Sequence, residues 1–149
     1  MDQVTPVTDH FTVEEFRCHD GTDYPAEWVA DRLTPLCQQL EVIRAELGGV
    51  PATILSGYRT PAHNAALRDA DGSGTGVAKN SQHLYGRAAD VVFKGISPAD
   101  AHAAVLRLVA AGKIQIGGLG LYQTWIHVDI REGDHLARWN GPGVNSAAA

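Results

Sequence analysis

The sequence predicts an α+β domain with a small, mainly antiparallel sheet and flanking helices. Three observations favour this class: helical periodicity over residues 26–47, an apolar strand-like run at 88–93, and an alternating run at 126–130. Helical and strand patterns mix without a regular βαβ repeat, which disfavours a wholly parallel sheet. With 149 residues, 44% hydrophobic and 19% charged, the chain can bury one ordinary core.

The first part of the chain predicts a long helix followed by a strand. Apolar residues recur at helical spacing over 26–47, with a break or restart at Pro35 and a helix stop at Gly48 and Gly49. Residues 53–55 then form a short strand that runs into a turn.

Two further helices are expected. One starts at Pro61 and covers 61–67, and a Gly- and Ser-rich loop at 69–79 follows it. The other covers 98–111, with Ser97 as its N-cap and a proline in its first turn. His102 on this helix is predicted to be a surface residue.

Residues 1–139 are expected to form one domain, and residues 140–149 a loose tail. The two cysteines, Cys18 and Cys37, allow either one disulfide or two buried thiols. The net charge of −5 and pI near 5.7 argue against binding nucleic acid or an anionic membrane surface through bulk charge. Neither a signal peptide nor a membrane span is recognised in the sequence, and we expect a monomer.

A carboxylate interrupts the most strand-like run of the chain. Asp90 stands within Ala-Ala-Asp-Val-Val-Phe at 88–93, and His83 precedes it with Gly86 available for a turn between them. Burying an unpaired charge is too costly, so Asp90 must be paired or bound to a metal.

A second histidine lies in a strand pattern further along, within the aromatic and β-branched residues 119–130. His127 and Asp129 alternate there with apolar neighbours, so they face one side of the strand. Two imidazoles, His83 and His127, and the carboxylate of Asp90 are the ligand types of a catalytic zinc, which leaves its fourth position to water. The sequence therefore predicts a three-ligand zinc site, and hence a hydrolase.

A predicted turn at 56–61 presents Arg59 just past the end of a strand. The planar fork of donors on arginine suits either clamping a carboxylate or polarising a carbonyl. A surface pairing with an acidic residue is the alternative.

These clusters, in this order, resemble the zinc D-Ala-D-Ala carboxypeptidase family, whose members share the hedgehog/DD-peptidase fold. The segments that carry the resemblance are His10-Phe-Thr-Val-Glu-Glu-Phe16, Ser56-Gly-Tyr-Arg-Thr-Pro61, Ser81-Gln-His-Leu-Tyr-Gly-Arg-Ala-Ala-Asp90, Gly118-Leu-Gly-Leu-Tyr122 and Arg138-Trp-Asn140. The third segment, of the form Ser-x-His-x-x-Gly-x-Ala-x-Asp, is the most specific.

The resemblance implies one zinc ion per chain, held by His83, Asp90 and His127. It also implies that Arg59 takes part in substrate binding and transition-state stabilisation, and we expect Ser81 and Gln82 to contact substrate. The implied substrates are the stem peptides or cross-links of bacterial peptidoglycan, cleaved by a carboxypeptidase or an endopeptidase. The protein would then act on the cell wall, either as a phage-type lysin released from the cytoplasm or as a secreted protein whose leader is missing here.

The sequence departs from the family at the general base. Many relatives place an acidic residue three positions before the last zinc histidine, where this chain has Thr124. Asp129 is the first candidate for the base, although it could equally orient a ligand imidazole. Tyr122 could donate to a developing oxyanion, and His63 is a weaker candidate.

The sequence leaves two alternative functions open. The missing acid at Thr124 also fits a non-catalytic, zinc-containing interaction domain of the same fold. A serine hydrolase using Ser81 and His83 ranks low, because residues so close in sequence rarely reach a nucleophile-base geometry and no Gly-x-Ser-x-Gly elbow is present.

Overall fold

The computed structural model of the protein describes residues 4–71 and 80–144. The predicted loop at 69–79 begins as the end of a helix, and its remainder, residues 72–79, lies outside the described residues. The elements are β1 (Pro6–Thr8), β2 (Phe11–Thr12), η1 (Val13–Phe16), η2 (Ala26–Trp28), η3 (Val29–Leu33), α1 (Thr34–Glu46), β3 (Ala52–Ser56), α2 (Pro61–Asp71), η4 (Gln82–Tyr85), β4 (Ala88–Phe93), α3 (Pro98–Ala110), β5 (Gly118–Leu121), β6 (Ile126–Asp129) and β7 (Ala137–Asn140).

The main sheet has five strands in the order β3-β4-β6-β5-β7. The three pairs within β3-β4-β6-β5 are antiparallel, and β7 joins β5 in parallel at the edge. A separate hairpin is formed by β1 and β2. The predicted α+β class with a mainly antiparallel sheet is therefore confirmed.

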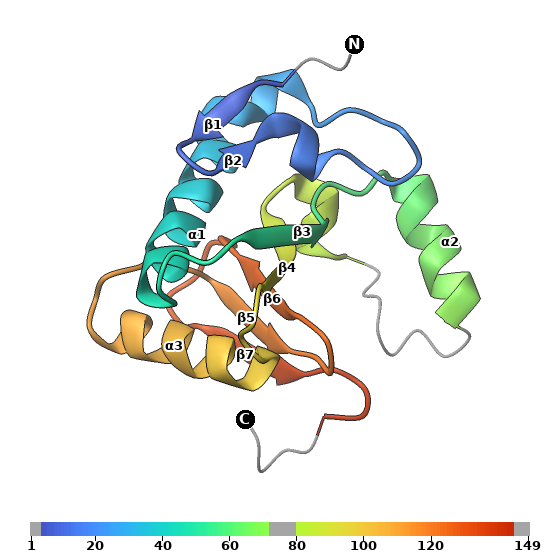
Figure 1. Cartoon of the computed structure of the whole chain (residues 1–149). Helices are drawn as coiled ribbons and strands as arrows, with labels where there is room; N and C mark the ends of the chain where they lie inside the picture. The colour runs from blue at the N-terminus through green and yellow to red at the C-terminus, as the bar shows by residue number, and fades with distance from the viewer. Residues whose placement is uncertain (1–3, 72–79, 145–149) are drawn as a thin grey trace.

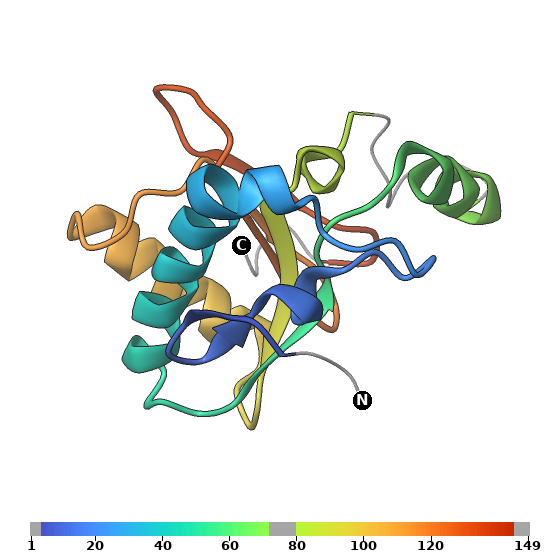
Figure 2. The same ribbon diagram turned by 90° about the horizontal axis from the view of Figure 1, so that it is seen from above.

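Two helices cover one face of the sheet. In Figures 1 and 2, α1 and α3 lie together on one side of the strands, and α2 stands apart on the other side. The core lies between the sheet and these two helices, where apolar residues of α1 and α3 are buried with Leu119, Ile126 and Val128 of the strands. Ile126 and Val128 point into this core, so the intervening His127 and Asp129 belong to the opposite face.

Local sequence signals explain where the helices begin and end. Pro35 stands in the first turn of α1, where its missing N–H costs nothing, and a π-helical turn precedes it. Gly48 and Gly49 follow the end of α1 with φ values of 90° and 75°, which only glycine adopts easily. The Ser97 hydroxyl accepts a hydrogen bond from the Asp100 N–H at 3.1 Å and caps α3, as predicted.

The region 119–130 forms two strands, β5 and β6, joined by a turn in which the Tyr122 N–H donates to the Trp125 carbonyl at 3.0 Å. Two other expectations need correction. His102 is buried rather than exposed, because it lies beside the face of α3 that packs on the core. Residue 140 does not begin a loose tail: β7 includes Asn140, the Gly141 N–H donates to the Leu121 carbonyl at 2.8 Å, and Val144 packs on the core.

None of the helices within residues 4–71 and 80–144 combines the length and the hydropathy that a membrane span needs. Cys18 and Cys37 are both buried as free thiols. Burial raises the pKa of the Cys37 thiol, so this side chain stays protonated and unreactive at neutral pH.

Because neither thiol is accessible, we expect the native protein to react slowly with a thiol reagent such as Ellman's reagent and to yield two thiols per chain after denaturation. The denatured sample should give the same yield with and without prior reduction. A yield of two thiols only after reduction would show that the cysteines are bonded.

Candidate metal centre

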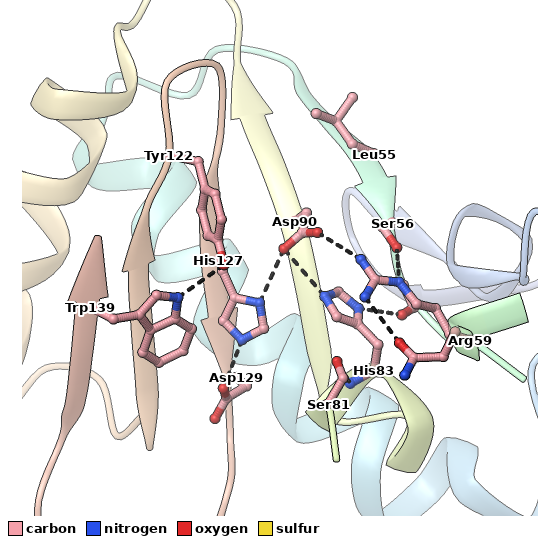
Figure 3. Close-up of polar contacts among 12 residues, drawn as sticks. Leu55, Ser56, Arg59, Ser81, His83, Asp90, Tyr122, His127, Asp129 and Trp139 are labelled. Atoms are coloured by element: carbon pink, nitrogen blue, oxygen red, sulfur yellow. Dashed lines mark hydrogen bonds and ion pairs between the residues drawn. The ribbon is translucent and has the colours of Figure 1, made fainter. Parts of the chain in front are cut away.

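One row of residues across the main sheet carries the site. Paired positions run from Ser56 of β3 to Asp90 of β4, then to His127 of β6, Gly120 of β5 and Trp139 of β7. Directly paired residues project to the same face of a sheet. These positions therefore form one row on the face opposite the helical core, in which Ser56, Asp90 and His127 carry polar side chains, as Figure 3 shows for its labelled members.

The centre of this row is a cluster of two imidazoles around one carboxylate. Asp90 Oδ1 lies 3.3 Å from His83 Nε2 and 3.1 Å from His127 Nδ1, and one ligand atom from each of the three residues lies within 4.8 Å of the others. All three side chains are buried. Ligands at about 2.0–2.1 Å from a tetrahedral zinc are themselves roughly 3.3 Å apart, so the two distances to Asp90 Oδ1 fit such an ion.

An acceptor binds the outer nitrogen of each imidazole. This bond determines which nitrogen of the ring faces the cluster. His83 Nδ1 donates to the Gly57 carbonyl at 2.6 Å, so its Nε2 keeps a lone pair toward Asp90. His127 Nε2 bonds to Asp129 Oδ2 at 2.7 Å, so its Nδ1 faces Asp90. Metal-bound histidines are commonly oriented in this way by a carbonyl or carboxylate on the other nitrogen.

Asp129 does not face the inner side of the cluster. It is fully buried and lies at the outer nitrogen of His127, where Arg131 donates to both of its carboxylate oxygens at 2.9 and 2.7 Å. The Arg131 backbone N–H adds a third bond, at 3.0 Å. The structure therefore joins Asp129 to His127, as expected for neighbours on one face of a strand, but at the nitrogen turned away from Asp90.

The ionisable groups of the cluster shift one another's pKa values. Burial lowers the pKa of His83, which keeps that imidazole neutral. Burial alone would raise the pKa of Asp90, but His83 and His127 outweigh it and hold that pKa well below its usual range. Burial by itself would lower the pKa of His127. The hydrogen bonds of His127 to Asp129 and Asp90 outweigh burial and raise its pKa. A metal ion at this place would displace protons, as metal ions generally do at imidazole ligands.

Arg59 reaches the other oxygen of the same carboxylate. Its Nη2 lies 3.3 Å from Asp90 Oδ2, and its Nε donates to Ser56 Oγ at 3.2 Å (Figure 3). A longer contact joins Nη1 to Asn64 Oδ1 at 3.5 Å. Only 11% of the Arg59 side chain is exposed, so this arginine belongs to the cluster rather than to the surface.

The remaining candidate residues lie around the cluster in different ways. Ser81 Oγ accepts from the His83 backbone N–H at 3.2 Å and caps η4, and Gln82 is half-buried at the start of η4. Both ring nitrogens of His83 have other partners, so Ser81 and His83 are not arranged as a nucleophile and its base. His63 on α2 has its ring 6.3 Å from the ring of His19.

Tyr122 stands at one flank of the cluster, in the turn after β5. Its ring stacks on Trp125 at 4.7 Å, and its hydroxyl accepts a hydrogen bond from Trp139 Nε1 at 3.0 Å. Burial raises its pKa, so the phenol stays protonated and able to donate.

The sequence patterns predict no role in the site for Arg131 or Trp139. Arg131 lies past the end of the alternating run, and Trp139 is brought in by the edge strand β7. The glycines of β5 were a usable signal: a Cβ on Gly118 would overlap the Asp129 carboxylate, and one on Gly120 would lie 2.6 Å from Trp139 Nε1. Alternating glycine and leucine in a strand indicates that side chains from neighbouring strands approach over it.

Comparison with known protein families identifies the family of this chain. The Peptidase M15 family model matches residues 9–129, which include all three residues of the cluster. A search of curated proteins found no match. A solved structure, the L-Ala D-Glu endopeptidase ChiX of Serratia marcescens, is 22% identical with a TM-score of 0.43, covering 68% of this chain and 87% of that one. The family match confirms the resemblance noted in the sequence: the chain belongs to the Peptidase M15 family.

Proposed function

We propose that this peptidase is zinc-dependent and hydrolyses peptide bonds in the stem peptides or cross-links of bacterial peptidoglycan. The observation that carries the proposal is the buried convergence of His83, Asp90 and His127, in which a separate group holds the outer side of each ligand. Membership of the Peptidase M15 family supports the reaction class. The choice of peptidoglycan rests on the motif resemblance.

The donor set fits zinc better than the hard cations. Two imidazole nitrogens and one carboxylate oxygen match a catalytic zinc site, whereas calcium and magnesium prefer oxygen ligands throughout. When bound, zinc would supply Lewis acidity for a water molecule and for the carbonyl of the cleaved bond. His83, Asp90 and His127 would hold the ion.

Arg59 and Tyr122 would act on the substrate. Arginine has five N–H donors, and three of those on Arg59 are engaged with Asp90, Ser56 and Asn64. Within residues 4–71 and 80–144 these are its side-chain partners, which leaves the other two donors for a substrate carboxylate or carbonyl. The protonated phenol of Tyr122 can donate to oxygen as negative charge develops there, and Ser81 and Gln82, beside His83, stay candidates for substrate contact.

Asp129 would position His127 rather than serve as the general base. A base must reach the proton that it removes, and the Asp129 carboxylate is buried behind the outer nitrogen of His127 and held by Arg131. The same contacts suit a carboxylate that fixes the tautomer and raises the basicity of a ligand imidazole.

A zinc-containing interaction domain is the second candidate. Thr124, in the position where many relatives carry an acid, lies exposed in the turn between β5 and β6 and supports this reading. Membership of the Peptidase M15 family favours catalysis over this second candidate.

Digestion of purified peptidoglycan tests the proposal directly. We expect protein stripped by a chelator and then restored with zinc to release a defined stem-peptide fragment, identified by its mass, and stripped protein to release none. His83→Ala, Asp90→Ala and His127→Ala should lose zinc and activity together, since a tetrahedral site needs all three ligands.

His135→Ala, at an exposed histidine in the loop before β7, is the matched control and should keep both zinc and activity. Bound zinc without cleavage of any wall type would favour the interaction domain. Full activity after loss of a ligand would contradict the site itself.

Asp129→Asn separates the two roles of Asp129. If Asp129 positions His127, the variant should bind zinc about 10–100-fold more weakly, as measured by competition with a chromogenic chelator. The amide keeps the size of the side chain but loses the charge shared with Arg131. Asp134→Asn, on the exposed loop, should bind zinc normally. Normal zinc affinity with turnover reduced about 100-fold would instead identify Asp129 as the base.

Arg59→Ala should lower kcat/KM by about 100-fold or more while the protein still binds one zinc per chain, because Arg59 contacts Asp90 from outside the ligand trio. Zinc content by atomic absorption and wall digestion rates together check this. Arg107→Ala, an exposed arginine on α3, is the control and should match the unmodified protein. Loss of zinc in Arg59→Ala would show that Arg59 maintains the metal site rather than stabilising the transition state.

A further inference from the structure

Trp139 completes the row of residues that carries the site. It lies on β7, the parallel edge strand, opposite Gly120, and Gly120 is in turn opposite His127. With no side chain at Gly120, the rings of Trp139 and His127 approach over it to 5.0 Å between centroids. Trp139 lies beyond residues 9–129, the part of the chain matched by the family model.

The contacts of Trp139 are specific as well as apolar. Its Nε1 donates to the Tyr122 hydroxyl oxygen at 3.0 Å (Figure 3). The Arg131 guanidinium lies over its ring, 5.1 Å from the centroid. Arg131 also holds Asp129, the partner of His127. Trp139 therefore contacts both Tyr122 and Arg131, the two residues that flank the metal-binding cluster next to β7.

The direction of the hydrogen bond matters for chemistry. An indole nitrogen only donates, so the Tyr122 oxygen must accept from Trp139 and cannot direct its own proton there. The phenolic O–H is left to donate to another acceptor. The hydroxyl lies on the side of the cluster, because Trp139, which donates to it, packs against the ring of His127.

We propose that Trp139 is a positioning residue, which holds the Tyr122 hydroxyl so that its O–H donates to the oxygen of the cleaved carbonyl. The inference rests on the peptidase function proposed above. Preorganised donors of this kind act mainly in the transition state, where charge develops on the oxygen, so the effect of Trp139 belongs to kcat rather than to KM.

A neighbouring tryptophan provides a matched control. Trp125 stacks on the ring of the same tyrosine, but its Nε1 is buried without a hydrogen-bond partner among the described residues. Trp125→Phe and Trp139→Phe thus remove the same N–H from two neighbours of Tyr122, and only the second removal breaks a hydrogen bond to the hydroxyl.

The kinetic test is a double-mutant cycle of Trp139→Phe and Tyr122→Phe on wall digestion by the zinc-loaded protein. Loss of one neutral hydrogen bond should lower kcat by roughly five- to tenfold in Trp139→Phe, with KM changed by less than about twofold. Tyr122→Phe should lower kcat further, and the double variant should equal Tyr122→Phe. Trp125→Phe should retain the kcat of the unmodified protein.

A spectroscopic test uses the metal-free protein. The three tryptophans give three indole N–H resonances, and Trp139→Phe assigns one of them by its loss. Tyr122→Phe should move that resonance upfield, as expected when an N–H loses its acceptor, and should leave the Trp125 resonance nearly in place. Zinc content and thermal midpoint, compared across the variants, identify any that fail to fold.

The outcomes are distinct. Equal kcat values for the double variant and Tyr122→Phe, together with the upfield shift, support the inference. The inference is overturned if the unmodified protein is active but the double variant loses kcat by the product of the two single losses. It is also overturned if the indole resonance does not move. In either case Trp139 contributes packing and does not position the Tyr122 hydroxyl. Failure of the unmodified protein to cleave any wall overturns the proposed function, and the inference with it.

Discussion

The site depends on one buried carboxylate at the centre of the sheet. Asp90 is almost inaccessible to water, and its two oxygens are shared by His83 and His127 on one side and Arg59 on the other. A charge in such a place is stable only when its partners are present. The need to neutralise Asp90 therefore accounts for the convergence of side chains from η4, from β6 and from the turn after β3.

A second layer of contacts orients the two imidazole rings of this cluster. The Gly57 carbonyl and the Asp129 carboxylate each take the outer nitrogen of one imidazole, so both inner nitrogens turn toward Asp90. Arg131 then neutralises Asp129, which has no exposure of its own. Positive and negative groups alternate from Arg131 to Arg59, and this alternation lets a strongly polar line lie across an otherwise apolar sheet.

Small residues in β5 make the crowding possible. The leucines of this strand face the helical core, while Gly118 and Gly120 face the site and leave their space to Asp129 and Trp139. As a result, side chains from β6 and β7, which are not neighbouring strands, meet over β5. The edge strand β7 thereby becomes part of the candidate active site as well as of the fold.

The sequence by itself determined the class of fold and the three members of the cluster, because both follow from local patterns. Asp90 interrupts an apolar run, and His127 alternates with core residues. Tertiary structure alone decided which nitrogen of His127 faces inward, and hence where Asp129 lies, because ring orientation depends on partners that no periodicity encodes. It also brought Trp139 to the row, since the register of a parallel edge strand is set by long-range pairing rather than by its own few residues.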